Sequence, residues 1–375
     1  MDKISLCISS SERQAARRLL LKMLAFMPLL CLVAGVNFRV DPIGIYKKAG
    51  NKYDSTEYRI AQELIAGKRV EIIQKIDDRH VHQFLIEGQS RIPDLIILGS
   101  SRAMDIGGGP PSKTRIMNHA LMGAVLMDYL GIVSQYEKKG QLPKSMVLLI
   151  DPGMFESFDG MEQNWDFKMD AQELLARMGI SIRGLPMGAL SDRWLNIVSL
   201  SYFQKSIKTW HQSRGRDPYK VVEDYVVPDM LWPDGRRLID MGELVSSAKI
   251  RRIAFQHYYT SVFGRHYSVV REQQLKRVLE RFIEYLVERH VEITLCLVPF
   301  HPVEYRAFLV MREKWGAFDI LKLEDYCHRL AEKFDLKLTG SYDPAVYGLK
   351  NEDFRDGEHL RSSAQNAPVK KIISF

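Results

Sequence analysis

The chain of 375 residues has only four cysteines, no long run of basic residues and no internal repeat. Four cysteines at wide spacing exclude a disulfide framework and a zinc site of the usual kind. Cys296 and Cys327 either pair with each other or remain separate buried thiols. The formal net charge is +7, from 53 basic and 46 acidic residues. Because no basic run or interleaved aromatic motif accompanies that charge, we expect no nucleic acid among the partners.

The sequence also lacks the patterns of a metal site or a nucleotide site. His80 and His82 form a His-x-His pair without a clear third ligand, so we expect surface or core histidines and no metal. Residues 107–109 are three glycines, but Pro110 and Pro111 follow where a phosphate-binding helix would have to begin. We therefore expect no cofactor, and a nucleotide-binding domain ranks last among the candidates.

Charge is missing altogether between Met23 and Phe38. With Lys22 reaching toward the headgroups, residues 19–38 provide the roughly twenty residues that a helix needs to cross a bilayer. A cluster of basic residues comes shortly before the uncharged run: Arg13, Arg17, Arg18 and Lys22. Because basic residues before a span favour a cytoplasmic N-terminus, the sequence predicts a cytoplasmic tail at 1–18 and a single anchor at 19–38. The anchor would lie in the cytoplasmic (inner) membrane, with the remaining chain on the periplasmic or extracellular side.

Two other interpretations of this segment stay open. The small residues of Val33-Ala34-Gly35 fit the cleavage site of a signal peptide. A buried core helix is the third interpretation, although core helices rarely run this long without a polar face.

Apolar residues make up 46% of the chain, which is ample for a large core. Five short apolar runs read as strands: residues 95–98, 116–117, 146–150, 293–298 and 336–338. Three helical patterns lie among them, at residues 121–136, 272–289 and 323–334. Because strands that alternate with helices form parallel sheets covered on both faces, we predict a doubly wound, flavodoxin-like α/β domain at 89–375.

Two segments depart from this alternation. Residues 39–88 are predicted to be a helical stalk, since apolar residues from Ile60 to Ile76 recur at spacings near three and four. Residues 152–267 form a large insertion after the third strand, rich in tryptophan and tyrosine. The insertion is either a lid or substrate platform, or a satellite subdomain whose aromatics form only its own core.

Three residues with the chemistry of a serine hydrolase follow strands of the predicted sheet. Ser101 follows the first apolar run, and Asp356 and His359 share a turn beyond the last run. A serine at the carboxyl end of a parallel strand lies where open α/β folds bind their ligands. A nucleophilic serine needs a histidine base that a carboxylate orients, and these three residues provide that set.

The order of these motifs resembles the SGNH (GDSL-like) hydrolase superfamily. Gly99-Ser100-Ser101 follows the first strand, Asn118-His-Ala-Leu-Met-Gly123 follows the second, and Asp356-x-x-His359 lies near the C-terminus. The resemblance covers residues 94–151 and 292–362. Within the superfamily, a membrane anchor with Gly-Ser-Ser in place of Gly-Asp-Ser looks like the alginate O-acetylation and teichoic acid D-alanylation proteins.

The resemblance implies a role for each matching residue. Ser101 would be the nucleophile, His359 its base, and Asp356 the carboxylate that holds the histidine. The backbone amides of Ser101 and Gly123 would receive the oxyanion, and Ser100 would stand where the superfamily has aspartate. Such donors contribute about 10² to 10³ in rate each.

The chain departs from the superfamily after the third strand, where Leu149-Ile-Asp151-Pro152 replaces the usual Gly-x-Asn-Asp block. An ionised aspartate accepts hydrogen bonds and does not donate them. Asp151 therefore either binds a substrate hydroxyl or simply ends the strand in a turn, and Asn118 becomes the candidate for the third oxyanion donor.

Two more side chains are candidates for substrate contact. Arg102 would pair with an anionic sugar or acyl donor, or else form a structural salt bridge. His301 ends the fourth strand at the same rim of the sheet. The triad residues have simpler readings as well: Ser101 as a helix N-cap, and His359 as a loop histidine beside an ordinary turn residue, Asp356.

The function predicted from these patterns is that of a membrane-anchored serine acyltransferase or esterase. It would act on O-acyl groups, most simply O-acetyl groups, of an exported cell-surface polysaccharide, beside other membrane proteins of a polymer assembly. The alternative is a catalytically inactive glycan-binding or scaffold protein, which the missing asparagine block favours.

Overall fold

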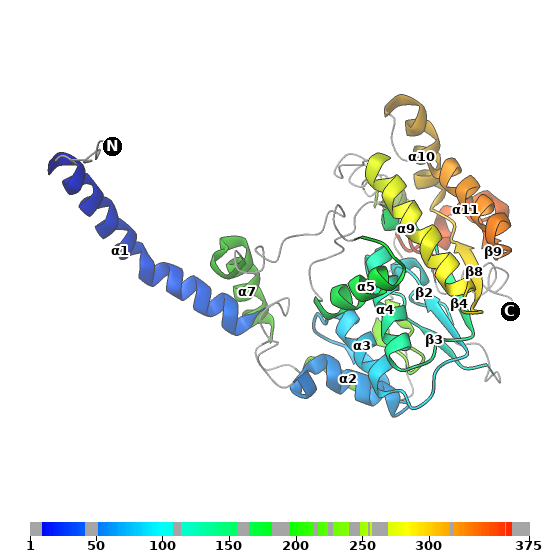
Figure 1. The fold of residues 1–375 in the computed structure, drawn as a ribbon, viewed down its shortest axis with the longest axis horizontal. Coiled ribbons are helices and arrows are strands. Elements are labelled where there is room, and N and C mark those ends of the chain that lie inside the picture. Colours follow the sequence, from blue (N-terminus) through cyan, green and yellow to red (C-terminus); the bar gives the residue numbers. More distant parts are fainter. Residues whose placement is uncertain are drawn as a thin grey trace, which may run out of the picture. The chain divides into compact units, whose positions relative to one another are not determined.

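The computed structural model of the chain forms two compact units, one of Met1–Asn51 with Gly188–Arg216 and one of Lys52–Met187 with Asp217–Phe375 (Figure 1). The structure describes residues 10–41, 52–107, 114–155, 165–181, 196–213, 217–223, 228–239, 248–253, 256, 269–315, 319–356 and 358–361. Both sheets of the described chain belong to the second unit.

The first unit contains α1 (Ser10–Val40), the 3-10 turn η5 (Asn196–Val198) and α7 (Leu200–Ser213). Buried Asn37 fastens α1 to this partner segment, since its amide donates to the carbonyls of Ile197 at 2.9 Å and Ser199 at 3.1 Å. Tyr202 adds a hydrogen bond from its hydroxyl to Asp41 at 2.7 Å. Residues 196–213 of the predicted insertion therefore pack with the N-terminal helix.

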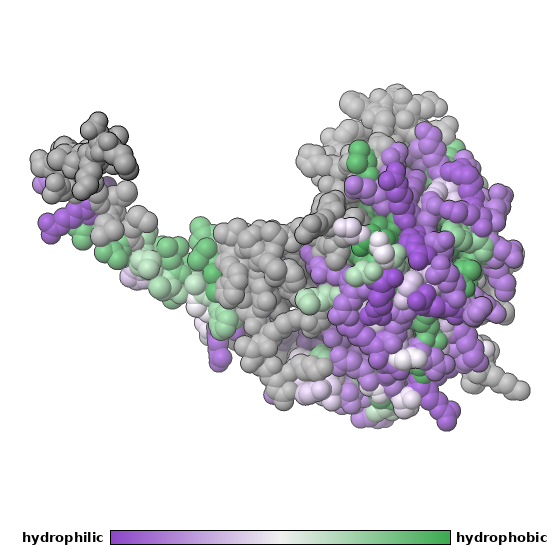
Figure 2. All heavy atoms as spheres, viewed as in Figure 1, coloured by the Kyte–Doolittle hydropathy of each residue, from purple (hydrophilic) through white to green (hydrophobic). Residues whose placement is uncertain are grey.

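Helix α1 contains the whole of the predicted anchor at residues 19–38. Leucine, phenylalanine and methionine side chains are exposed along the middle of this helix (Figure 2). Within the part of the chain that the structure describes, no helix combines the length and the apolar character needed to cross a membrane. The anchor at residues 19–38 stays a prediction from the charge pattern of the sequence.

The second unit is built on a five-stranded sheet of β2 (Leu95–Leu98), β3 (Ile116–Asn118), β4 (Ser145–Leu149), β8 (Glu292–Leu297) and β9 (Lys337–Gly340). The order across the sheet is β3-β2-β4-β8-β9, and every neighbouring pair is parallel. Numbered along the chain, this is the order 2-1-3-4-5 of flavodoxin-like folds. The predicted α/β class and all five strands are confirmed.

Side chains alternate between the two faces of this sheet and form two cores. Ile96 and Leu98 of β2 join the larger core, with residues of α4 (Leu126–Lys138), α5 (Trp165–Arg177), α9 (Val269–Val287), α10 (Pro302–Trp315) and α11 (Ile320–Phe334). Leu95 and Ile97 join the second core, which contains residues of the segment after β2 and Phe354. The sheet is covered on both faces, consistent with a doubly wound fold.

The unit also has a smaller antiparallel sheet, in which β1 (Arg69–Ile72) lies between β5 (Tyr219–Val222) and β6 (Asp229–Leu231), and β6 pairs with β7 (Arg237–Ile239). α2 (Thr56–Ile65) and α3 (Asp78–Gly88) pack against it through a separate apolar cluster. The remaining short turns are η2 (Lys52–Asp54), η3 (Ser101–Ala103), η4 (Pro152–Phe155), η6 (Pro344–Tyr347) and η7 (Asn351–Asp353).

The small sheet corrects two predictions. Residues 39–88 are not a purely helical stalk, because Arg69–Ile72 is a strand that pairs antiparallel with β5 and β6. Residues 217–223 and 228–239 of the insertion complete the sheet that β1 begins, so these residues form one sheet with a strand that precedes the predicted domain. The guanidinium groups of Arg69 and Arg236 each lie 4.3 Å from the centroid of the Trp232 ring, so this aromatic side chain stacks on cations of its own sheet. Trp194 and Tyr225 of the insertion lie outside the described residues.

Cys296 and Cys327 are free thiols and lie in the two different cores of the large sheet. Of the two alternatives for these cysteines, the structure shows separate buried thiols and no disulfide bond between them.

Candidate active site

Ser101, His359 and Asp356 meet at the carboxyl end of β2. His359 Nε2 lies 2.8 Å from Ser101 Oγ, and His359 Nδ1 lies 2.9 and 2.8 Å from the two carboxylate oxygens of Asp356. All three side chains are half-buried, so the serine is reachable from solvent. This position borders the point where the strand order reverses, between β2 and its neighbours, which is where open α/β sheets bind ligands.

The cap of the turn that carries the nucleophile is Ser100. Its hydroxyl accepts a hydrogen bond from the Arg102 amide at 3.3 Å, and its backbone is extended as an N-cap requires. Ser101 is the first residue inside the turn, and its hydroxyl faces His359. The alternative reading of Ser101 as an N-cap therefore does not hold.

The Asp356–His359 turn is held by several hydrogen bonds. Asp356 accepts from the backbone amides of Glu358 at 2.9 Å and His359 at 2.8 Å, as well as from the imidazole. Burial by itself raises the pKa of Asp356, but the hydrogen bonds and the charge of His359 outweigh it and lower the pKa to about 2. Asp356 is therefore an anion at neutral pH and fixes the orientation of the imidazole.

Within the described part of the chain, two backbone amides of the candidate oxyanion hole are free to donate: that of Ser101 itself and that of Gly123 in the loop after β3. Gly123 lies in an exposed turn with a φ of 59°, and the amide of Leu121 in the same turn donates to the Gly99 carbonyl at 2.9 Å. Among the residues that the structure describes, the N–H groups of Ser101 and Gly123 have no hydrogen-bond partner. Unpaired donors of this kind are what an oxyanion hole requires.

Asn118 does not supply a third donor. Its side-chain amide donates to the carbonyls of Ala103 at 2.7 Å and Ile106 at 2.8 Å, and its oxygen accepts from the Ala120 amide at 2.7 Å. Both amide hydrogens are thus committed, and the side chain is buried. The structure corrects the prediction: Asn118 joins the nucleophile segment to the loop after β3.

Arg102 and Asp151 form a buried ion pair at 2.8 Å. Arg102 also donates to the Pro299 carbonyl at 2.9 Å and lies 3.8 Å from the centre of the Phe300 ring. Asp151 also accepts a hydrogen bond from the Ser100 hydroxyl. Ser100 is the residue predicted to stand where the SGNH superfamily has aspartate, and here its side chain donates to the carboxylate that follows β4. Of the two roles that the sequence left open for Arg102, the structure shows the structural salt bridge. The same ion pair occupies Asp151, for which a contact with a substrate hydroxyl was one prediction.

This ion pair gives a prediction about stability. Asp151→Asn should lower the free energy of unfolding by about 3–5 kcal/mol, because the amide leaves the buried guanidinium without a counter-charge. Urea unfolding of the two proteins measures the difference. Glu63→Gln is the control, since it breaks the exposed pair with Lys68 and should cost about 0–1 kcal/mol. A change below about 1 kcal/mol in Asp151→Asn would contradict the prediction.

His301 does not reach a substrate either. Its side chain is completely buried, its Nδ1 accepts the Val303 amide at 3.1 Å, and its ring meets Phe354 edge to face at 5.2 Å between centroids. Burial lowers the pKa of His301 to about 4, so the ring is neutral at physiological pH. His301 supports the Asp356–His359 turn through Phe354.

A chain of buried polar side chains stands behind the loop after β3, and the sequence patterns did not reveal it. Nδ1 of His119 lies 3.0 Å from Nδ1 of His82, and Nε2 of His119 lies 2.6 Å from the Tyr136 hydroxyl. Burial keeps both imidazoles neutral by lowering their pKa values. His80 pairs with Asp77 at 3.1 Å and takes no part. The only signal in the sequence was a histidine that closely follows the apolar run at 116–117.

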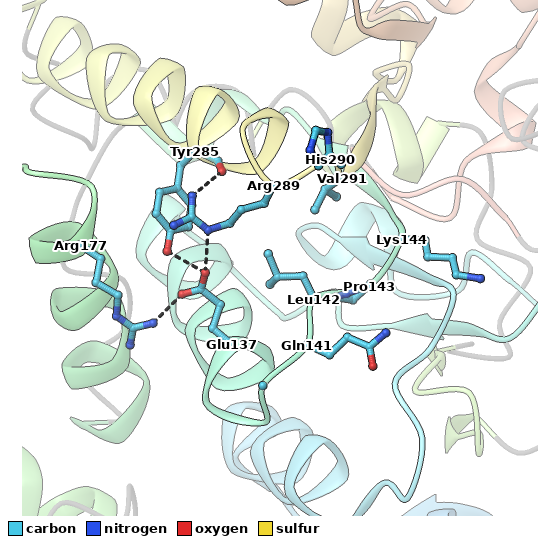
Figure 3. Close-up of a pocket in the computed structure, with 11 residues that line it drawn as sticks. Glu137, Gln141, Leu142, Pro143, Lys144, Arg177, Tyr285, Arg289, His290 and Val291 are labelled. Carbon is cyan, nitrogen blue, oxygen red and sulfur yellow. Dashed lines mark hydrogen bonds and ion pairs between the residues drawn. The ribbon is translucent and has the colours of Figure 1, made fainter.

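The hollow shown in Figure 3 lies at the opposite, amino end of the parallel sheet. It has a volume of about 620 Å³ and is lined by residues of α4, α5, α9 and the loops that enter β4 and β8. Its main carboxylate, Glu137, is already bonded to Arg177, Arg289 and the Tyr285 hydroxyl. None of the triad residues lines this hollow, so it is separate from the candidate active site.

No protein-family model, curated protein or solved structure matches this chain. Its function is therefore inferred from the geometry of the site and the order of its motifs.

Proposed function

We propose that this chain is a serine esterase or O-acyltransferase that works through an acyl-serine intermediate. The observation that carries the proposal is the continuous contact from Ser101 through His359 to Asp356, with each link at 2.8–2.9 Å. A nucleophile, its base and the group that orients the base are recognised by this geometry rather than by their order in the sequence.

The reaction follows from the positions of the donors and acceptors. As Ser101 Oγ attacks an ester carbonyl, His359 Nε2 takes the hydroxyl proton, and the amides of Ser101 and Gly123 stabilise the oxyanion. Collapse of the tetrahedral intermediate leaves the acyl group on Ser101, and the departing alkoxide takes the proton from His359. A second hydroxyl, from water or from an acceptor alcohol, then attacks the acyl-serine with His359 again as the base.

The structure also bears on the rival idea of an inactive scaffold. That idea depended on the missing asparagine block, where an oxyanion donor was expected. Asp151 instead neutralises Arg102 beneath the nucleophile, and the two amides do not need a side chain to complete a hole. These contacts favour the enzyme over the glycan-binding or scaffold protein.

The substrate part of the proposal comes from the resemblance of the motifs. We place the acyl group, most simply acetyl, on hydroxyls of an exported cell-surface polysaccharide, with other membrane proteins as partners. The location at the cytoplasmic membrane, with the active site outside, stays a prediction from the charge pattern of the first 38 residues. Transfer and hydrolysis share the acyl-serine and differ only in the hydroxyl that resolves it.

Acetate release from an activated acetyl ester by the full-length protein tests the proposal. A serine-directed fluorophosphonate, followed by mass spectrometry of the labelled peptide, should place the label on Ser101. Adding an oligosaccharide acceptor then separates a transferase, which yields acetylated sugar, from an esterase. Absence of both turnover and labelling would overturn the proposal.

A further inference from the structure

The β6–β7 hairpin lies against the two loops that carry the candidate oxyanion donors. The Arg237 amide donates to the Met104 carbonyl at 2.8 Å, just beyond the nucleophile turn. The Asn118 amide donates to the Asp234 carbonyl at 2.8 Å, at the start of the loop that ends in Gly123. One hairpin is thus hydrogen-bonded to both loops.

The same hairpin contacts the segment that carries the base. The guanidinium of Arg355 donates to the carbonyl of Ile239, the last residue of β7. Arg355 directly precedes Asp356, and its backbone amide donates to the His359 carbonyl at 3.0 Å. All three segments of the candidate site therefore meet at one supersecondary element.

Arg237 holds the hairpin in place through a buried network. Its Nε donates to Asp229 at 2.7 Å, and another of its nitrogens donates to Asp78 at the start of α3. Arg237 and Asp78 are both buried. Planar guanidinium groups that bind two carboxylates in this way fix orientation as well as position.

The close approach of the hairpin depends on a glycine. Gly235 has a φ of 80°, and a Cβ placed on it would lie 2.2 Å from the backbone oxygen of Asn118. A side chain there would both strain the turn and push it away from the loop after β3.

We propose that the β6–β7 hairpin is a positioning element of the active site, with Gly235 and Arg237 as its key residues. The inference rests on the proposed serine chemistry. Two amides stabilise one oxyanion only when both point at the same oxygen, and these amides come from loops on different strands. The hairpin sets the distance between those loops, and β1 supplies its neighbouring strand.

Gly235→Ala is the decisive variant, with Gly140→Ala as its matched control. Gly140 has a φ of 83°, a Cβ added to it would meet no atom within 4 Å, and it lies at the opposite end of the sheet. The number of active sites is counted by titrating Ser101 with the fluorophosphonate, and kcat on the activated acetyl ester is expressed per titrated site. We expect this kcat to fall about 10- to 100-fold in Gly235→Ala. KM should change less than about twofold, and Gly140→Ala should keep the wild-type kcat per titrated site.

A merely structural role would lower the number of titratable sites without changing kcat per site. Should Gly235→Ala yield no folded protein, Asp229→Asn decides, because it removes the charge of a carboxylate that holds Arg237 of the hairpin and leaves the triad residues untouched. We expect a fall of about 3- to 10-fold in kcat per site, and none in Arg329→Gln, which changes an exposed side chain of α11. If the wild type is active and the variant has the same kcat per site as its control, the inference is overturned. A wild type that neither turns over nor labels overturns the proposed function itself.

Discussion

Ester turnover is expected to disappear when Ser101 is replaced by alanine, with kcat falling about 10⁴- to 10⁶-fold. The hydroxyl that forms the acyl bond is lost, whereas the fold loses only a half-buried contact with His359. The measurement is acetate release at saturating ester, together with fluorophosphonate labelling. Far-UV circular dichroism and the urea midpoint should match those of the wild type.

The control for this substitution is Ser90→Ala, which removes an exposed hydroxyl in the loop before β2. It should label and turn over like the wild type. Labelling that persists in Ser101→Ala and maps to Ser100 would contradict the assignment, because Ser100 is buried and donates to Asp151 in the structure.

Asp356→Asn is expected to lower kcat about 10³- to 10⁴-fold with little change in KM. An amide at this position can donate to Nδ1 of His359, which favours the tautomer whose Nε2 carries the proton and cannot accept one from Ser101. The variant should remain folded, since asparagine keeps the size of the side chain and can still accept from the Glu358 amide. Steady-state kinetics of the variant beside Asp335→Asn, an exposed helix-capping aspartate, test this expectation.

The pH dependence of stability tests the same carboxylate independently. The pKa of Asp356 is lowered to about 2 in the folded protein, against about 3.9 when unfolded. The stabilisation it gives is therefore complete above about pH 4 and is lost as the pH falls through about 2. The gap in unfolding free energy between the wild type and Asp356→Asn should narrow below about pH 4. A gap that widens there would contradict the assigned pKa.

The large sheet could be predicted because each of its strands is an apolar run too short for a helix. Leu95–Leu98 is buried at every position, and the runs at 146–150 and 293–298 differ from the observed strands by one residue at each end. Strand β1 was missed because Val70, Ile73 and Ile76 also fit a helical spacing. Its partners β5 and β6 lie about 150 residues away, and short-range patterns carry no information about such pairing.

The triad could be predicted because its chemistry demands particular residue types at strand ends. The supporting side chains could not, since Arg102, Asp151 and Asn118 all suit substrate binding when judged by residue type alone. Their roles depend on burial: Arg102 meets Asp151 across neighbouring strands, and Asn118 finds three backbone partners within its own unit. Residue type indicates what a group can do, and the partners in space decide which of those things it does.

The place of β1 in the small sheet has a consequence for synthesis of the chain on the ribosome. β1 ends at Ile72, and its partner β5 begins at Tyr219. At about 5–20 residues per second, translation leaves β1 without a partner for roughly 7–30 s. A strand edge that waits this long is exposed to wrong pairing. The covering of β1 by α2 and α3, both made at nearly the same time, would shield its apolar side chains until the hairpin arrives.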